Sequence, residues 1–195
     1  MNDIQYICVY RSSSPLINEN YVMTAKELGK LFAEHQIELI YGAGKVGLMG
    51  TMADAVLERG GKVTGVIPTF MIERDWHHNR LTTLLEVDTM HERKQKMASL
   101  SDGVVALPGG CGTLEELLEI ITWKQLGLYA NPIVIVNTNG FYNPLIEMLN
   151  KAIDEKFMRS NHRDLWQVAN KVTEVMDLLT TTPLWNSSTD KFGKE

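Results

Sequence analysis

The chain has 195 residues, which suits one domain with a single sizeable core. A hydrophobic share of 44% and a charged share of 22% are ordinary for a globular protein. The formal net charge is −5, from 19 Lys and Arg against 24 Asp and Glu, which argues against nucleic-acid binding as the main task. The two cysteines, Cys8 and Cys111, are too few to form a disulfide framework.

No targeting or membrane segment is expected. The first five residues lack the positive region and the long apolar core of a signal peptide. No stretch approaches the ~20 uninterrupted apolar residues that a membrane-spanning helix needs. We therefore expect a cytoplasmic protein that binds neither a membrane nor nucleic acid.

Short apolar runs alternate with longer amphipathic stretches along the chain. Strands are expected at residues 4–10, 38–41, 62–68, 103–107 and 132–136, and helices at 18–35, 48–59, 90–100, 113–126 and 143–155. This alternation indicates an α/β, Rossmann-like fold with three layers, in which a doubly wound parallel sheet carries helices on both faces. We expect one Rossmann-like domain over residues 1–180. Periodicity is lost after it, so a loose C-terminal tail is expected over 181–195.

A glycine-rich loop at residues 108–113 follows one of the buried strands and opens a helix. Ligands of such sheets bind beyond the carboxyl ends of the strands. Glycine N–H groups and the helix N-terminus can converge there on phosphate oxygens, and Thr113 adds a hydroxyl. A simpler interpretation is a tight turn, with Thr113 as N-cap and Glu116 closing a capping box. Three glycines within four residues favour the anion site.

A second glycine loop, residues 42–47, has the G-x-G-x-x-G spacing of dinucleotide-binding folds. It follows the second strand rather than the first, and the next strand ends in no acid that would hold a ribose. Lys45 is followed by Val46, so the loop is not a Walker A motif. Glycines that permit tight helix–sheet packing explain the pattern at least as well. We therefore expect neither NAD nor ATP, and no cofactor.

Arg93 and Glu116 are the candidates for the chemistry. Arg93 belongs to the segment directly before the strand that leads into the 108–113 loop, although a solvated helix face is the ordinary interpretation of such a charged run. Glu116 lies one turn inside the helix that follows the loop. A carboxylate there can stabilise an oxocarbenium ion or position water, while a cation holds the sugar phosphate.

Residues 108–116 read PGGCGTLEE and fit the P-G-G-x-G-T-x-x-E motif of the cytokinin riboside 5′-monophosphate phosphoribohydrolase family (LONELY GUY, LOG). Residues 90–94, MHERK, resemble its second signature, and residues 41–50 resemble its glycine segment. The resemblance covers roughly residues 4–157. It implies a Rossmann-like fold, a homodimer, and hydrolysis of an N6-modified adenosine 5′-monophosphate to a free base and ribose 5-phosphate.

The resemblance also assigns site residues. Arg93 and Glu116 match the catalytic positions. The substrate-binding positions are matched by Asp75, Arg93, Lys94, Gly109, Gly110, Gly112, Thr113, Glu115 and Thr122. Asp75 stands where relatives carry Glu, and Arg11 begins a loop in which relatives often read Cys-Gly-Ser-Ser.

Three alternatives are considered. Family members are often labelled lysine decarboxylases, but a pyridoxal enzyme needs a Schiff-base lysine in its own context, for which the sequence gives no support. The same chemistry on AMP or another purine 5′-monophosphate is possible. A non-catalytic carrier of a phosphorylated cofactor is the third, and the presence of both Arg93 and Glu116 argues against it. No metal site is expected, because His77 and His78 lack further ligands at suitable spacing and are expected in an exposed loop.

Overall fold

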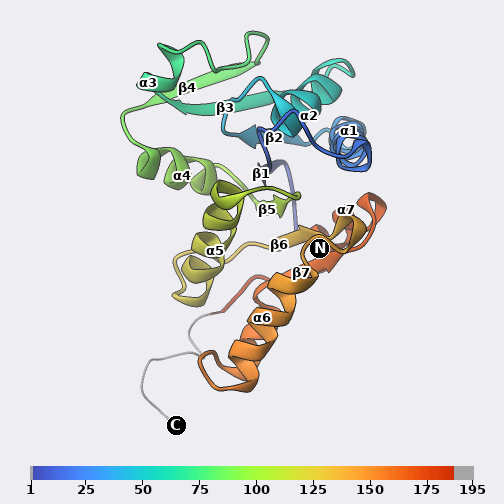
Figure 1. Ribbon diagram of the computed structural model, residues 1–195, viewed down its shortest axis with the longest axis vertical. Coiled ribbons are helices and arrows are strands. Elements are labelled where there is room, and N and C mark those ends of the chain that lie inside the picture. The colour runs from blue at the N-terminus through green and yellow to red at the C-terminus, as the bar shows by residue number, and fades with distance from the viewer. Residues whose placement is uncertain (1, 187–195) are drawn as a thin grey trace.

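The computed structural model describes residues 2–186. Its seven strands form one parallel sheet in the order β4-β3-β2-β1-β5-β6-β7 (Figure 1). The strands are β1 Tyr6–Tyr10, β2 Glu38–Tyr41, β3 Val63–Pro68, β4 Thr83–Val87, β5 Gly103–Ala106, β6 Ile133–Val136 and β7 Gln167–Ala169. The expected α/β, Rossmann-like fold is confirmed.

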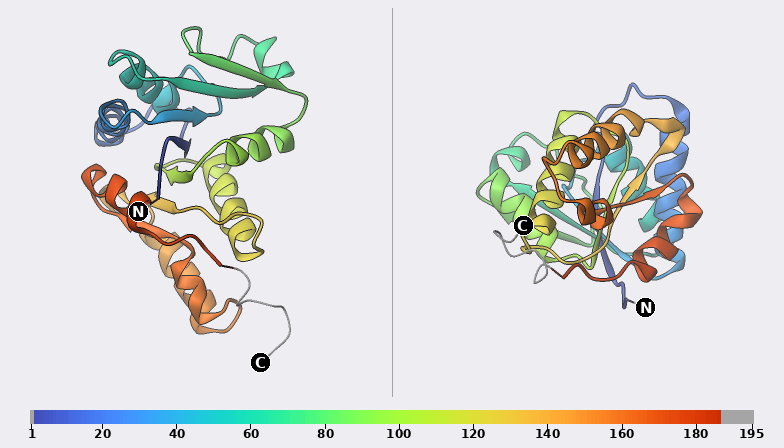
Figure 2. Two further views of the ribbon diagram at one scale, coloured as in Figure 1. Left: turned by 180° about the vertical axis from the view of Figure 1, so that it is seen from behind. Right: turned by 90° about the horizontal axis from the view of Figure 1, so that it is seen from below.

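Helices cover both faces of the sheet, as Figures 1 and 2 show. One face packs against α1 Glu19–Glu34, α2 Gly47–Leu57 and α7 Val175–Thr181. The other packs against α4 Met90–Ser99, α5 Cys111–Gln125 and α6 Asn143–Asp154. A single short turn, α3 Thr69–Ile72, follows β3, and short 3-10 helices span Thr138–Gly140, Ser160–Leu165 and Val172–Glu174.

The central strands explain why the fold forms. In β5, Val104 joins the core beneath α4, α5 and α6, while its neighbour Val105 joins the core beneath α1, α2 and α7. Alternate side chains of a strand point to opposite faces, so a strand between two helical layers must be apolar throughout. Each fully buried valine of this kind contributes roughly 1.5–3 kcal/mol.

All five expected strands are present, but the two edge strands, β4 and β7, were not expected. The side chains of β4 are exposed or half-buried, and β7 has only three residues. Neither carries a continuous apolar run, because an edge strand is covered less than a central one. Backbone pairing with β3 and with β6 places them in the sheet.

The segment after residue 180 is held more firmly than expected. Helix α7 reaches Thr181, Asn2 Nδ2 donates to the Thr182 carbonyl at 2.8 Å, and Trp185 N donates to the Ala130 carbonyl at 2.8 Å. The expected loose tail of 181–195 therefore starts too early, since these backbone groups bind the domain. Residues 187–195 of that tail lie outside the described part of the chain.

Candidate active site

The loops of interest gather at the carboxyl edge of the sheet, around the neighbouring strands β1 and β5. The chain leaves β1 toward α1 on one face and leaves β5 toward α5 on the other. This is the topological switch point at which sheets of this kind bind their ligands.

The glycine loop after β5 ends in the N-terminus of α5. The helix begins at Cys111, with Gly110 as its N-cap and no capping side chain, two residues earlier than expected. Thr113 is therefore not the N-cap, and the capping-box alternative is wrong. Instead Thr113 is buried against Gly109, where an added Cβ would lie 2.1 Å from Thr113 Oγ1.

The backbone at this helix start is exposed at residues 110–112. A Cβ added to Gly110 or Gly112 would meet no atom within 4 Å. The first N–H groups of a helix lack intrahelical partners and carry partial positive charge. The 15-residue helix α5 therefore presents an accessible site for an anion such as a phosphate.

Arg93 and Glu116 lie together beneath this edge. Arg93 Nη1 is 3.6 Å from Glu116 Oε1, and the two residues are only 4% and 7% exposed. Two backbone carbonyls hold the guanidinium: Nε donates to the Val66 carbonyl and Nη2 to the Gly42 carbonyl, each at 3.2 Å. The start of α4 and the start of α5 thus bring a cation and a carboxylate to one point.

Burial raises the pKa of the Glu116 carboxyl to about 7, and the nearby Arg93 charge offsets only part of that rise. Removing water from a carboxylate disfavours its charged form. Near neutral pH both the protonated and the ionised forms of Glu116 are therefore populated, which suits a group acting in acid–base chemistry.

Lys94 and Glu115 bind each other. The buried Lys94 Nζ forms an ion pair with Glu115 and a second with Glu119 at 3.1 Å. The charge on α4 thus holds the first turns of α5. These two residues, both matched to substrate-binding positions, lie one residue beyond Arg93 and one before Glu116.

Asp75 lies over the second glycine loop. It forms an ion pair with Lys45 at 2.6 Å, and Lys45 N donates to the Trp76 carbonyl at 3.2 Å. Arg93 binds the Gly42 carbonyl at the other end of the same loop.

Thr122 lies farther away. It is exposed on the fourth turn of α5, with its hydroxyl donating to the Leu118 carbonyl at 2.8 Å. Nine residues separate it from Thr113, which is about 13 Å along a helix. The structure does not bring Thr122 to the anion loop of its own chain.

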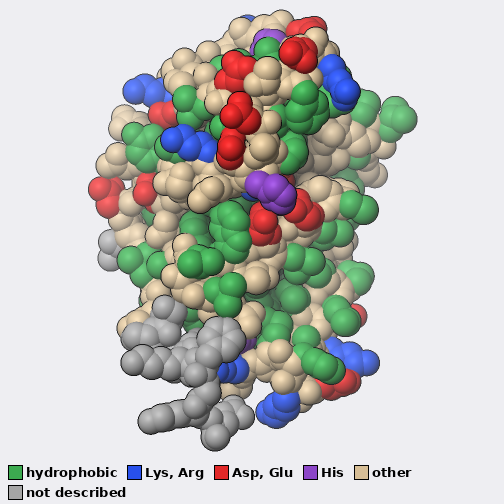
Figure 3. All heavy atoms as spheres, turned by 90° about the vertical axis from the view of Figure 1, so that its left-hand side faces the viewer, with side chains coloured by type: hydrophobic (Ala, Val, Ile, Leu, Met, Phe, Trp, Pro, Cys, Tyr) green, Lys and Arg blue, Asp and Glu red, His purple; other side chains and the backbone are tan. Residues whose placement is uncertain are grey.

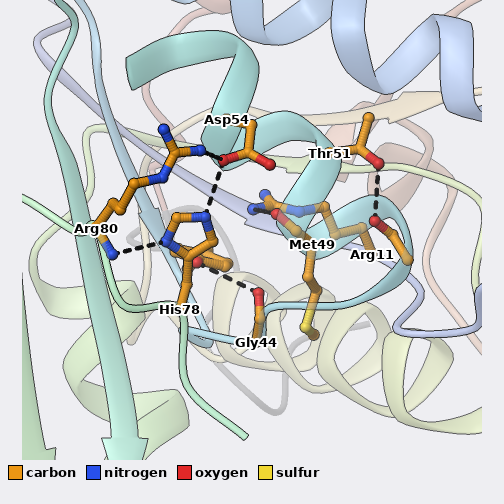
Figure 4. Close-up of polar contacts among 9 residues, drawn as sticks. Arg11, Gly44, Met49, Thr51, Asp54, His78 and Arg80 are labelled. Carbon is orange, nitrogen blue, oxygen red and sulfur yellow. Dashed lines mark hydrogen bonds and ion pairs between the residues drawn. The ribbon is translucent and has the colours of Figure 1, made fainter. Parts of the chain in front are cut away.

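His78 is buried in a polar network with α2. It is 8% exposed, with Nε2 3.0 Å from Asp54 Oδ1, and Arg80 also pairs with Asp54 (Figure 4). The expectation of an exposed His78 was wrong, because this network ties the segment after α3 to α2. Within residues 2–186 no three His, Cys, Asp or Glu residues form a group that could hold a metal ion.

Arg11 adds a buried positive charge that the sequence analysis did not place. The side chain is 1% exposed, and its Nη2 donates to the Met49 carbonyl at 3.1 Å (Figure 4). Its guanidinium lies 4.4 Å from the centre of the Tyr41 ring. Burial lowers the pKa of Arg11 to about 10, so it stays charged at neutral pH. The sequence signal that could have indicated this buried charge is an arginine directly after an apolar strand.

The fold and the site define a Rossmann-like α/β protein with a glycine loop at the N-terminus of a helix, beside a buried Arg–Glu pair. Residues 49–179 match the family described as "Possible lysine decarboxylase". The chain is 37% identical to cytokinin riboside 5′-monophosphate phosphoribohydrolase LOG2 of Arabidopsis thaliana, over 97% of this chain and 93% of that protein. It is 43% identical to the probable phosphoribohydrolase LOGL9 of Oryza sativa subsp. japonica, over 82% of this chain and 70% of that protein. The chain belongs to the cytokinin riboside 5′-monophosphate phosphoribohydrolase family.

Solved structures with the same fold include carriers of a cofactor. The molybdenum cofactor carrier protein of Chlamydomonas reinhardtii superposes with a TM-score of 0.67 at 22% identity, covering 91% of this chain and 99% of that one. The molybdenum cofactor binding protein of Rippkaea orientalis superposes with a TM-score of 0.67 at 17% identity, covering 90% of this chain and 95% of that one. These similarities support the fold.

Proposed function

We propose that this protein hydrolyses the N-glycosidic bond of a cytokinin riboside 5′-monophosphate, an N6-modified adenosine 5′-monophosphate. The products are the free base and ribose 5-phosphate. The observation that carries the proposal is the buried Arg93–Glu116 pair beside the open N-terminus of α5, in a chain of this family.

In this proposal the substrate phosphate binds at the start of α5. The N–H groups of residues 110–113 receive its oxygens, with the Gly109–Thr113 contact shaping the loop. Arg93 and Glu116 then face the ribose, where charge develops as the C1′–N9 bond breaks. The Glu116 carboxylate stabilises the oxocarbenium ion and accepts a proton from the attacking water, whose oxygen bonds to C1′. The base leaves with the bonding electron pair and takes up a proton.

The remaining assigned residues surround this centre. Asp75 and the Lys94–Glu115 pair are proposed to contact the ribose or the base. An apolar N6 substituent has Trp76 available to it, since this side chain is 46% exposed beside Asp75, whereas Met97 is 1% exposed and belongs to the core.

We further propose a cytoplasmic homodimer in which Thr122 contacts the partner's substrate. Leu118 and Thr122 lie one turn apart on α5, and Leu126, its C-cap residue, follows four positions after Thr122. Both leucines are at least 40% exposed. Figure 3 shows apolar side chains on the face of the molecule that carries α4 and α5. Among residues 2–186 no helix is long and apolar enough to cross a membrane.

Light scattering tests the homodimer. The wild-type protein should give twice the mass of the chain, and the double variant Leu118→Arg, Leu126→Arg should give the mass of one chain. A wild-type monomer would contradict the proposal.

Base release tests the activity directly. Purified protein is incubated with AMP, with isopentenyladenosine 5′-monophosphate and with the two nucleosides, and free base is quantified by chromatography. Release from the 5′-monophosphates alone is expected. Glu116→Gln and Arg93→Ala should each abolish it while leaving the circular dichroism spectrum unchanged. Full activity in either variant, or equal release from nucleosides, would overturn the assignment.

Two other functions are distinguished by the same experiment. A higher rate on AMP than on the isopentenyl substrate would favour a general purine 5′-monophosphate nucleosidase. The structural similarity to molybdenum cofactor carriers motivates the second alternative, a non-catalytic carrier. Tight nucleotide binding with no base released from any substrate would favour that function.

A further inference from the structure

The hydroxyl of Tyr142 contacts the residue that directly precedes the glycine loop of residues 108–113. Tyr142 is 1% exposed, and its hydroxyl donates to the Leu107 carbonyl at 2.7 Å. Leu107 directly precedes Pro108, the first residue of the loop. Burial raises the pKa of Tyr142 well above its ordinary value, so the phenol remains a donor throughout the neutral range.

The backbone of Tyr142 is held equally firmly. Its N–H donates to Asn137 Oδ1 at 2.8 Å, and Asn137 N donates to the Ala169 carbonyl of β7 at 2.8 Å. The turn between them includes Gly140 at a φ of +69°, a conformation that glycine adopts without strain. The ring of Tyr142 packs against the edge of Phe141, with ring centres 5.1 Å apart. Tyr142 is therefore held both at its backbone and at its hydroxyl before any ligand binds.

The direction of the loop depends on the Leu107 carbonyl. The peptide between Leu107 and Pro108 is planar, and the proline ring holds φ near about −65°. Fixing the carbonyl oxygen therefore fixes the direction in which the chain enters the loop. Beyond Pro108 the next two residues are glycines, which have the widest choice of backbone conformations. The hydrogen bond from Tyr142 to the Leu107 carbonyl therefore acts on the last restricted part of the backbone before the two glycines.

We propose that Tyr142 is a positioning residue for the phosphate loop. By holding the Leu107 carbonyl it keeps the N–H groups of residues 110–113 converged on the place of the substrate phosphate. Tyr142 does not itself touch the substrate. The inference rests on the proposed function, because it assumes that the loop receives a phosphate monoester. Ordering the loop during folding reduces the entropy cost that binding would otherwise bear.

Tyr142→Phe removes only the hydroxyl and tests the inference. Tyr129→Phe is the matched control, since Tyr129 is also buried but lies between α5 and β6. Loss of a buried hydrogen bond should raise KM for the 5′-monophosphate by about tenfold in Tyr142→Phe, with kcat changed by less than about threefold. The Kd of ribose 5-phosphate, measured by calorimetry, should rise by a similar factor. The control variant should keep both values.

The outcomes separate this inference from the proposed function. Unchanged KM and Kd in Tyr142→Phe, even with a lower Tm, would mean that the hydroxyl serves stability alone and would overturn the inference. A wild-type protein that binds ribose 5-phosphate but releases no base would overturn the proposed function. In that case weaker ribose 5-phosphate binding by Tyr142→Phe would still support the role of Tyr142.

Discussion

The guanidinium of Arg93 occupies the space that a side chain at position 42 would fill. A Cβ added to Gly42 would lie 1.6 Å from Arg93 Nη2, and the same Nη2 donates to the Gly42 carbonyl at 3.2 Å. The glycine is therefore required by the arginine. The G-x-G-x-x-G spacing that resembles a dinucleotide loop serves here, at its first glycine, to seat a catalytic candidate.

Gly42→Ala should accordingly displace Arg93. We expect kcat/KM for the 5′-monophosphate to fall by about 100-fold or more, the size of loss typical when one electrostatic group leaves its place. Gly44→Ala is the comparison in the same loop, because its Cβ would meet only the flexible end of the Met49 side chain. The kcat/KM of Gly44→Ala should fall far less than that of Gly42→Ala. Equal losses in the two variants would show that loop strain, rather than the arginine, is responsible.

The pH profile of base release should reflect Glu116. Its pKa is raised to about 7 by burial, so the carboxylate form grows as pH rises through 7. If that form acts, kcat/KM should increase tenfold per pH unit below about pH 7 and level off above it. A wild-type profile that is flat between pH 5 and 8 would contradict this role.

Glu116 should also affect stability with a definite sign. Its folded pKa lies above its ordinary value of 4.5, so the folded state holds the extra proton between pH 4.5 and about 7. Above pH 7 the folded protein bears the cost of a buried charge, on the order of 3 kcal/mol. Glu116→Gln should therefore be more stable than wild type above pH 7, and the difference should shrink to nothing below pH 4.5. Urea unfolding at the two extremes measures it.

Lys124 offers a stabilising substitution away from the site. It is 1% exposed on α5, its Nζ has no hydrogen-bond partner within residues 2–186, and burial lowers its pKa to about 8. Below pH 8 the folded state carries an uncompensated charge, and the penalty disappears as pH rises from 8 to 10.5. Lys124→Met should raise the free energy of unfolding at pH 7 by about 3 kcal/mol. A gain of the same size at pH 10.5 would contradict this explanation.

The two cysteines should differ sharply in reactivity. Cys111 is exposed at the first residue of α5, whereas Cys8 is buried and burial raises the pKa of its thiol well above the ordinary value. Iodoacetamide should label Cys111 alone and block base release, because the adduct lies at the anion loop. Ribose 5-phosphate should protect the thiol, and Cys111→Ser should resist inactivation. Mass spectrometry of the labelled peptide identifies the site.

Much of this architecture is predictable because its signals are local. The apolar runs of β5 and β6 and the glycines before α5 follow from strand burial and from close approach to an anion, both of which depend on neighbouring residues. The edge strand β4 has no such local signal, since its place depends on pairing with β3. The start of α5 was predicted at Thr113 but lies at Cys111. Thr113 packs against Gly109 instead of capping the helix, and this contact has no local signal either.

The sheet type, the family resemblance and the choice of Arg93 and Glu116 as candidates all follow from the order of residues along the chain. The tertiary structure adds that Arg93 leaves the solvated face of a charged helix and lies 3.6 Å from Glu116, where it binds the Gly42 and Val66 carbonyls. It also decided that Lys94 binds Glu115, that Arg11 is buried under α2, and that Tyr142 anchors Leu107. Desolvation and hydrogen bonding act between residues that are distant in sequence, so the charge state of Glu116 and the shape of its loop emerge only when the strands assemble.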